Sequence, residues 1–233
     1  AAAGVAFNIS GGGNAVITPA STTSLQTLTG ITVAGSNMKI TAAHAAIVTT
    51  GLNVDATSTL DLTNNDLIVD YADGNLTTGP AVVALVQSAY DHGAWDGLGV
   101  TSSMASIASG TTLAVVDNAN NATPLVGMVD GVTLDGSSVA VKYTWYGDTN
   151  LDGIVDSSDL TTMTNDLGSS GVGWNGGDLN YDGIVNSDDL GLFMLGLAEY
   201  NAHGQQNISS VPEPSAALML IGLGALATRR RRA

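Results

Sequence analysis

The sequence predicts a mainly β protein that finishes in helices. Short apolar pairs with a period of two recur from Ile31 to Val69, a fourteen-residue phrase occurs twice between Gly147 and Leu190, and an apolar run closes the chain. We expect the end of a right-handed parallel β-helix (solenoid) over residues 1–73 and a small α/β connector over 74–146. An α-helical pair of loops over 147–200, a linker over 201–210 and a tail over 211–233 with a hydrophobic helix would follow.

Composition bounds what this chain of 233 residues can do. Its length allows one or two domains, and it has no cysteine for disulfides or thiolate metal sites. Before the terminal arginines the basic side chains are Lys39 and Lys142, against 21 acidic residues. Such a surface repels nucleic acid, so we expect no nucleic-acid partner. Because the sequence starts at Ala1 without an initiator methionine, we expect it to be the C-terminal part of a longer protein.

The first region contains pairs of apolar residues separated by one position, which point to one face of a strand. The pairs are Ile31/Val33, Met38/Ile40, Ala45/Ile47, Leu52/Val54, Leu60/Leu62 and Leu67/Val69, with Val5/Phe7 and Ala15/Ile17 as upstream candidates. Three successive pairs span about 21 or 22 residues, which would align Ile31 with Leu52, Met38 with Leu60 and Ala45 with Leu67.

Three short strands per turn are what a right-handed parallel β-helix needs, with equivalent strands stacked on neighbouring coils. An antiparallel sandwich is the alternative, since short strands with polar turns also fit it. Asn64–Asn65 is expected to form a turn, with an asparagine stack as the other possibility. In texture, the region resembles the end of secreted bacterial β-solenoids built from autotransporter-associated repeats.

The connector begins after Gly79–Pro80, which interrupts the strand pattern. A helix is predicted over residues 81–93 and a short helical turn over 102–109. Strands are predicted over 112–117 and 132–146, the second as a hairpin with Asp135–Gly136 at its turn.

We expect no catalytic residue in this chain. His92 lies beside Asp91, with Trp95 and Asp96 nearby, and a histidine flanked by acids could serve as a base. The alternative is a histidine at a helix C-terminus, where the helix dipole favours it. No nucleophile motif, phosphate loop or paired-histidine metal signature accompanies it.

The duplicated phrase reads GDTNLDGIVDSSDL from Gly147 and GDLNYDGIVNSDDL from Gly177. Each copy places oxygen donors at positions 1, 3, 5, 9 and 12, a glycine at position 6, and a backbone carbonyl at position 7. The first copy supplies Asp148, Asn150, Asp152, Ile154, Asp156 and Asp159. The second supplies Asp178, Asn180, Asp182, Ile184, Asn186 and Asp189.

This spacing is that of a calcium loop. Calcium is a hard cation that takes six to eight oxygen ligands, and such a loop wraps them around one point. Two Asp/Asn/Gly-rich surface turns are the alternative, because these residues favour turns anyway. Two copies in register, each with glycine at position 6 and a carboxylate at position 12, favour two bound calcium ions.

A helical pattern follows each loop, while VKYTWY before Asp148 indicates a strand. Leu160, Met163 and Leu167 would share one face of the first helix, and Leu190, Phe193, Met194 and Leu197 one face of the second. Duplicated loop-then-helix units with aspartate at position 12 resemble the type I dockerin domain, over roughly residues 146–200.

That resemblance implies one calcium per half, antiparallel packing of the two helices, and a possible cohesin-like partner. In the family, positions 10 and 11 help to recognise the cohesin, and here they are Ser157–Ser158 and Ser187–Asp188. The basic residues that often follow in dockerins are missing, since this segment has no lysine or arginine.

The tail carries Val211, Pro212, Glu213 and Pro214, then an apolar run over 216–227, then Arg229, Arg230, Arg231 and Arg232. This order resembles the PEP-CTERM sorting signal of Gram-negative, often polysaccharide-producing bacteria. The resemblance implies recognition by an exosortase in the inner membrane, cleavage near Pro-Glu-Pro, and delivery to the cell surface or extracellular matrix.

The physics of the tail fits a transient anchor. Residues 215–228 would make a transmembrane helix of roughly 21 Å, shorter than a hydrocarbon core of about 30 Å, with the arginines on the cytoplasmic side. A core or amphipathic helix with a basic end is the alternative.

Together these features predict an exported, non-catalytic structural protein of the cell surface or extracellular matrix, with a calcium-stabilised module and a membrane sorting signal. In the alternative, the chain is the dockerin-bearing C-terminus of a polysaccharide-active enzyme or of a glycan-binding adhesin, whose functional domain lies upstream.

Overall fold

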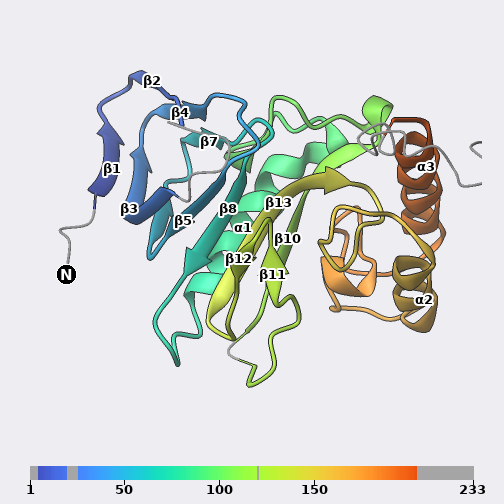
Figure 1. Ribbon diagram of the computed structural model, residues 1–233. Coiled ribbons are helices and arrows are strands. Elements are labelled where there is room, and N and C mark those ends of the chain that lie inside the picture. The colour runs from blue at the N-terminus through green and yellow to red at the C-terminus, as the bar shows by residue number, and fades with distance from the viewer. Residues whose placement is uncertain (1–4, 20–25, 120, 204–233) are drawn as a thin grey trace, which may run out of the picture.

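The computed structural model describes residues 5–19, 26–119 and 121–203. Its strands lie at the N-terminal end and across the middle, α1 packs along the large sheet, and α2 and α3 stand at the opposite end (Figure 1). The architecture is mainly β, as predicted.

Three sheets make up the β part. The largest runs in the order β1 (Val5–Ser10), β3 (Gln26–Ala34), β5 (Ala46–Thr49), β8 (Asp66–Asp70), β13 (Ser138–Trp145), β10 (Thr111–Asp117), with β6 (Leu52–Val54) also paired to β3. The second runs in the order β2 (Asn14–Ile17), β4 (Asn37–Ile40), β7 (Thr59–Asp61), β9 (Gly99–Thr101). The third contains β11 (Met128–Val129) and β12 (Val132–Thr133).

Strands from β1 to β8 pair in parallel with partners about one predicted repeat away, and β9 pairs in parallel with β7 across 40 residues, as in Thr59 with Gly99. Ile31 lies opposite Leu52 and Met38 opposite Leu60, which confirms two of the three predicted alignments. The described pairs in this part are parallel, which contradicts the antiparallel-sandwich alternative.

The third alignment is wrong by two residues. Leu67 lies opposite Ile47 instead of Ala45, because the chain between β7 and β8 makes a tight turn at Thr63 and Asn64. Upstream, the pattern continues as expected. Phe7 lies opposite Ile31, and Ala15 opposite Met38.

Apolar side chains fill the space between the sheets, because alternate residues of each strand point inward. Val33, Leu60, Leu62 and Leu67 are fully buried there. Dense packing of these side chains supplies the main stabilising term for a region that has few charged groups.

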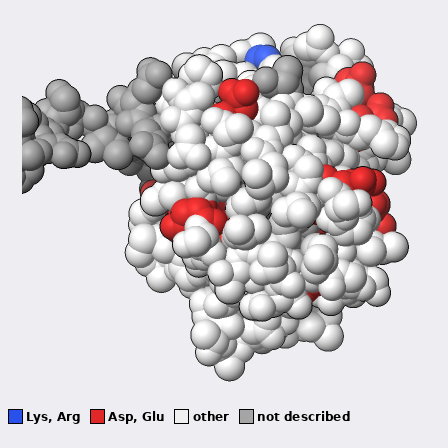
Figure 2. Space-filling view, turned by 90° about the vertical axis from the view of Figure 1, so that its right-hand side faces the viewer, with Lys and Arg blue, Asp and Glu red and all other residues white. Residues whose placement is uncertain are grey.

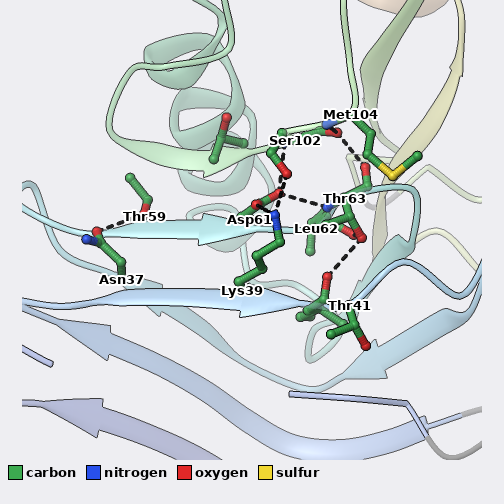
Figure 3. A network of polar contacts seen from close by, with 12 residues as sticks. Asn37, Lys39, Thr41, Thr59, Asp61, Leu62, Thr63, Ser102 and Met104 are labelled. Atoms are coloured by element: carbon green, nitrogen blue, oxygen red, sulfur yellow. Dashed lines mark hydrogen bonds and ion pairs between the residues drawn. The ribbon is translucent and has the colours of Figure 1, made fainter. Parts of the chain in front are cut away.

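Polar side chains join successive strands at the edge of this core. Lys39 on β4 forms an ion pair with Asp61 on β7, with 2.9 Å between Nζ and Oδ2 (Figure 3). Further along, Thr59 Oγ1 donates to Asn37 Oδ1 at 2.8 Å. These contacts tie strands that lie 22 residues apart in sequence, and so help to fix the register.

The predicted turn at Asn64–Asn65 also acts as a tie between strands. Asn65 Nδ2 donates to the Thr41 carbonyl at 2.9 Å, and Asn65 Oδ1 accepts from Ala45 N–H at 3.1 Å. Asn64 Oδ1 accepts from Ala43 N–H at 3.0 Å. Both buried amides satisfy the backbone of the preceding segment, so the turn and its cross-strand role coexist.

The connector helix α1 (Thr78–Tyr90) begins three residues earlier than predicted. Gly79–Pro80 therefore belongs to its first turn, where proline is tolerated because that N–H has no helical partner. Two short 3₁₀ turns, η1 (Asp91–Gly93) and η2 (Ile107–Ser109), follow it.

The predicted hairpin at Asp135–Gly136 is wrong. β12 pairs with β11, whereas β13 lies between β8 and β10 and is antiparallel to both. Asp135 and Gly136 are suited to a turn, but β13 pairs with β8 and β10, which are longer strands than β12. Strands from the predicted regions 1–73 and 74–146 therefore share one sheet, and the domain boundaries stay predictions.

We expect Leu60→Ala to lower the free energy of unfolding by about 2–5 kcal/mol, because Leu60 is 0 % exposed and the cavity would stay empty. Urea unfolding followed by circular dichroism measures this. Leu76→Ala is the matched control, since Leu76 is 72 % exposed and should change stability by no more than about 0.5 kcal/mol. Equal losses in both variants would contradict the proposed core.

Candidate metal centre

Both predicted loops lie between the elements that the sequence indicated. β13 ends two residues before Gly147, and α2 (Ser157–Asn165) begins inside the last positions of the first loop. The second loop follows the 3₁₀ turn η3 (Trp174–Gly176) and leads into α3 (Ser187–His203). The helix after each loop is confirmed. α3 runs to His203, so residues 201–203, assigned to the linker, are helical.

The predicted apolar faces are only partly right. Met163 and Phe193 are buried, and Leu160 and Leu197 pack at the edge of the core. Leu167, Leu190 and Met194 are exposed instead. Leu167 lies beyond the end of α2.

α3 turns a different stripe toward the rest of the protein, made of Phe193, Gly196, Leu197 and Tyr200. Gly196 permits the close approach, because a Cβ there would lie 1.8 Å from the Tyr146 carbonyl oxygen. Gly147 is restricted in the same way, with a positive φ of 96° and Phe193 2.7 Å from the position of a Cβ.

The first loop is closed by its own carboxylates. Asp148 Oδ2, at position 1, accepts from Gly153 N–H at 3.0 Å. Asp159, at position 12, accepts from Thr149 N–H at 2.9 Å and from Asp156 N–H at 3.0 Å. Both ends of the loop are therefore tied to its interior.

In the middle of the first loop, side-chain oxygens accept hydrogen bonds from backbone amides and so fix the turn. Asn150 Oδ1 accepts from Asp152 N–H at 2.9 Å, and Asp152 Oδ1 accepts from Ile154 N–H at 2.8 Å. Gly153 has a φ of 85°, a left-handed conformation that favours glycine. Asp156 caps α2 by accepting from Ser158 N–H at 2.7 Å.

The second loop repeats this arrangement. Asp178 Oδ2 accepts from Gly183 N–H at 3.0 Å, and Asp189 accepts from Leu179 N–H at 2.8 Å and from Asn186 N–H at 2.9 Å. Asn180 and Asp182 make the same amide contacts as their counterparts in the first loop. The duplicated sequence therefore gives a duplicated geometry.

Each loop leaves one buried carboxylate oxygen without a partner. Asp148 Oδ1 and Asp178 Oδ1, both at position 1, are buried and accept no hydrogen bond from any described group. A buried, unpaired carboxylate oxygen is costly, and a cation would offset that cost. The residues present therefore fit a hard cation such as calcium.

Burial also perturbs the titration of these carboxyl groups. Burial raises the pKa of Asp148 to about 7, and the nearby Asp159 carboxyl adds to the effect. Burial likewise raises the pKa values of Asp159 and Asp178. A divalent cation would reverse these shifts, because it favours the ionised carboxylates.

The carboxylates have not gathered around a point. In the described part of the chain, no three or more His, Cys, Asp or Glu side chains form a group that could hold a metal ion. The acceptors of Asp152 and Asp156 are engaged by amides of their own loop. The twelve ligand positions accordingly stay predictions, with the two unpaired oxygens as their support.

Three residues that the sequence did not single out hold the loops, two of them on the large sheet and one on the segment between the loops. Thr144, on β13, donates its hydroxyl to Asp148 Oδ2. Trp174 Nε1–H donates to the Asp148 carbonyl at 2.7 Å. Tyr181 O–H donates to the Leu113 carbonyl on β10 at 2.7 Å.

The ring of Tyr181 reinforces this contact, with its centroid 5.3 Å from that of Tyr90 on α1 in an edge-to-face arrangement. Tyr181 occupies position 4 of its loop, where the first loop has Leu151. Both residues have a positive φ. The difference in the sequence is the aromatic side chain of Tyr181, which was the signal that could have indicated an intramolecular contact here.

His92 lies outside this centre, at the end of α1. Its side chain is fully exposed, and Nδ1 is 3.2 Å from Asp91 Oδ1. This is the location that the helix-end alternative predicted.

The molecular face in Figure 2 is largely uncharged, with separate acidic patches and little basic surface.

In the described residues, no helix is long and apolar enough to cross a membrane. The predicted tail, including Pro212, Pro214 and the four arginines, lies outside those residues.

Comparison with known families identifies two segments. The type I dockerin domain matches residues 146–194, and the PEP-CTERM protein-sorting motif matches residues 210–232. Searches of curated proteins and of solved structures gave no match. The resemblance of the N-terminal region to autotransporter-associated repeats stays a prediction. The chain thus carries a type I dockerin domain followed by a PEP-CTERM protein-sorting motif.

Proposed function

We propose that this chain is part of an exported, non-catalytic structural protein of the cell surface or extracellular matrix. The dockerin domain and the sorting motif support an exported surface protein with a calcium-binding module. The observation that carries the calcium-binding part of the proposal is the pair of buried, unpartnered oxygens of Asp148 and Asp178 at equivalent positions of two loops.

Two calcium ions would bind, one in each loop, through the side chains at positions 1, 3, 5, 9 and 12 and the carbonyl oxygen at position 7. Position 7 is Ile154 or Ile184, whose aliphatic side chains have no donor atom, so only the backbone carbonyl would contribute. The ions would supply positive charge that the loops lack. Since the loops contact β13 through Thr144 and β10 through Tyr181, calcium would stabilise more than the loops alone.

The N-terminal region would be the end of a right-handed parallel β-helix that serves as a stalk or body. Its support is the parallel pairing with offsets of 21 and 22 residues, as in Ile31 with Leu52 and Met38 with Leu60. The tail would then bring the protein to an exosortase in the inner membrane, with the arginines on the cytoplasmic side, before release to the surface.

A second candidate function is attachment to a cohesin-like protein. The chain would then be the C-terminal part of a polysaccharide-active enzyme or a glycan-binding adhesin, and its dockerin domain would bind the cohesin-like protein. The dockerin match favours it. Ser157, Ser158, Ser187 and Asp188 are exposed, so a partner could reach them. Binding of a cohesin that is lost on Ser157→Ala/Ser158→Ala substitution would select this candidate.

Calorimetric titration of the whole chain with calcium should show two bound ions. Asp148→Ala and Asp178→Ala should each remove one of them, because each deletes the buried position-1 carboxylate of one loop. Asp188→Ala is the matched control, since this exposed aspartate at position 11 is not a predicted ligand. Absence of binding up to several millimolar calcium would overturn the proposal.

Calcium affinity of the first loop should fall as the pH is lowered from about 8 to about 6, approaching tenfold per pH unit once the competing proton is bound. The reason is that burial raises the pKa of Asp148 to about 7, so a proton must leave before the carboxylate can bind the ion. Titrations of Asp178→Ala at several pH values isolate this loop. A constant affinity across that range would contradict the protonation of Asp148.

A further inference from the structure

Lys142 is one of two lysines in the sequence, and it is buried in the middle of β13. Its side chain is 8 % exposed, and Nζ lies 2.5 Å from Asp130 Oδ1. A buried ammonium costs several kcal/mol in desolvation and is seldom found unless it is paired. Neither calcium binding nor sorting makes use of this group.

Asp130 lies on the turn between β11 and β12, with a φ of 47° and a side chain that is 42 % exposed. The two-stranded sheet therefore presents this carboxyl group to Lys142 from outside the large sheet. The carboxyl group thus contacts the amine while the Asp130 side chain stays partly exposed.

A second carboxyl group, that of Asp66 on β8, completes the cluster. Asp66 is 4 % exposed, and its Oδ1 accepts from Tyr143 N–H at 2.9 Å. Burial and the hydrogen bond with Asp130 raise the pKa of Asp66 well above its usual value. The same hydrogen bond, together with Lys142, lowers the pKa of Asp130. Asp66 is therefore the protonated member, and its O–H donates to Asp130.

We propose that Lys142 and Asp130 condense spontaneously to an intramolecular amide that links Nζ to the side-chain carbonyl carbon, with Asp66 as the proton carrier. The product would be a covalent cross-link between β13 and the β11–β12 turn.

The step balances as a condensation. The lysine ammonium first passes a proton to the Asp130 carboxylate along their hydrogen bond, which gives a neutral amine beside a carboxylic acid. The amine nitrogen attacks the carboxyl carbon while Asp66 donates to the developing oxyanion. The nitrogen then loses its second proton, a hydroxyl leaves with a proton as water, the C–O bond breaks and the C–N bond remains. Asp66 ends with the proton that it began with.

Burial and proximity drive this reaction. Burial acts to lower the pKa of Lys142, but Asp66 and Asp130 outweigh it and raise that pKa, so the resting pair is ionised and the first proton transfer is uphill. The amide carries no charge, so its formation removes the desolvation cost of the buried pair. Holding the reacting groups in contact replaces a bimolecular encounter by an intramolecular one, for which effective molarities of about 10⁵–10⁸ M are attainable. The partial exposure of the Asp130 side chain gives the released water a way out.

The other lysine provides an internal comparison. Lys39 pairs with Asp61 at 2.9 Å, but its side chain is 46 % exposed. Asp61 accepts hydrogen bonds from Thr63 N–H and Ser103 N–H, not from a buried carboxyl group. We therefore expect an ordinary ion pair at Lys39.

The test is mass spectrometry of the purified full chain after denaturation and trypsin digestion. Lysines occur only at 39 and 142, and arginines only at 229–232. An amide at Lys142 would block cleavage there, leaving one fragment from residue 40 to the first cleaved arginine, lighter than its sequence mass by one water. Cleavage after Lys142 with unreduced masses would overturn the proposal.

Variants identify the bond. Asp130→Asn should lose ammonia instead of water, and Asp66→Asn should leave Lys142 uncross-linked and cleavable. Lys39→Met should keep the cross-link. Loss of water could also come from cyclisation at Asp130–Gly131, but that product would persist in Lys142→Met and would leave Lys142 of the wild type open to trypsin. Water loss with normal cleavage at Lys142 would therefore also contradict the amide.

Discussion

The rest of the structure depends on the pairing of β13 with β8. The strands before β9 stack in parallel and could end at β8, but β13 adds antiparallel to that edge and then receives β10 on its other side. The same strand carries Lys142 and Thr144 and leads directly into the first predicted calcium loop. A single strand thus connects the stacked β region, the α1 layer and the dockerin domain. This explains why the three predicted regions are physically continuous although their sequences differ in composition and period.

Charge is the second constraint. The loops place several aspartates within a short distance of one another, and the chain offers few cations to oppose them. In each loop the backbone satisfies most acceptors, yet it leaves one oxygen of the first aspartate buried and unpaired. The raised pKa of Asp148 reflects the same imbalance, because protonation is the other way to neutralise that oxygen. A bound divalent cation and a bound proton are therefore alternatives at this position, because either would neutralise the unpaired oxygen.

How much the sequence could predict depends on how far apart in the chain the interacting residues lie. The calcium loops are encoded within twelve successive residues, so spacing alone located every candidate ligand. The register of Ile31 with Leu52 was also accessible, because a repeating pattern reports its own period. Ala45 with Leu67 failed by two residues because Thr63 and Asn64 shorten that turn. The partner of β13 could not be read from Asp135–Gly136, since a local turn signal competes with longer pairing to strands distant in sequence. Tyr181 was missed for the same reason, as its partner Leu113 lies 68 residues away. Thr144 was missed although its partner Asp148 lies only four residues further along, because the strand pattern before the loop does not indicate which hydroxyl reaches that carboxylate.

The two acidic loops and the Lys142 cluster would each constrain a part of the chain that buries little apolar surface. A chain without cysteine has no disulfide to hold a short two-stranded sheet or a pair of acidic loops that bury little apolar surface. Calcium would constrain the loops reversibly, so their stability would vary with calcium concentration and pH. An amide between Lys142 and Asp130 would constrain the β11–β12 turn permanently and independently of both. The two devices act on adjacent parts of the same sheet, since Lys142 and Thr144 lie two residues apart on β13. The large sheet would then keep its cross-link when calcium is withdrawn, and loss of the ions would loosen the dockerin domain before it loosened β13.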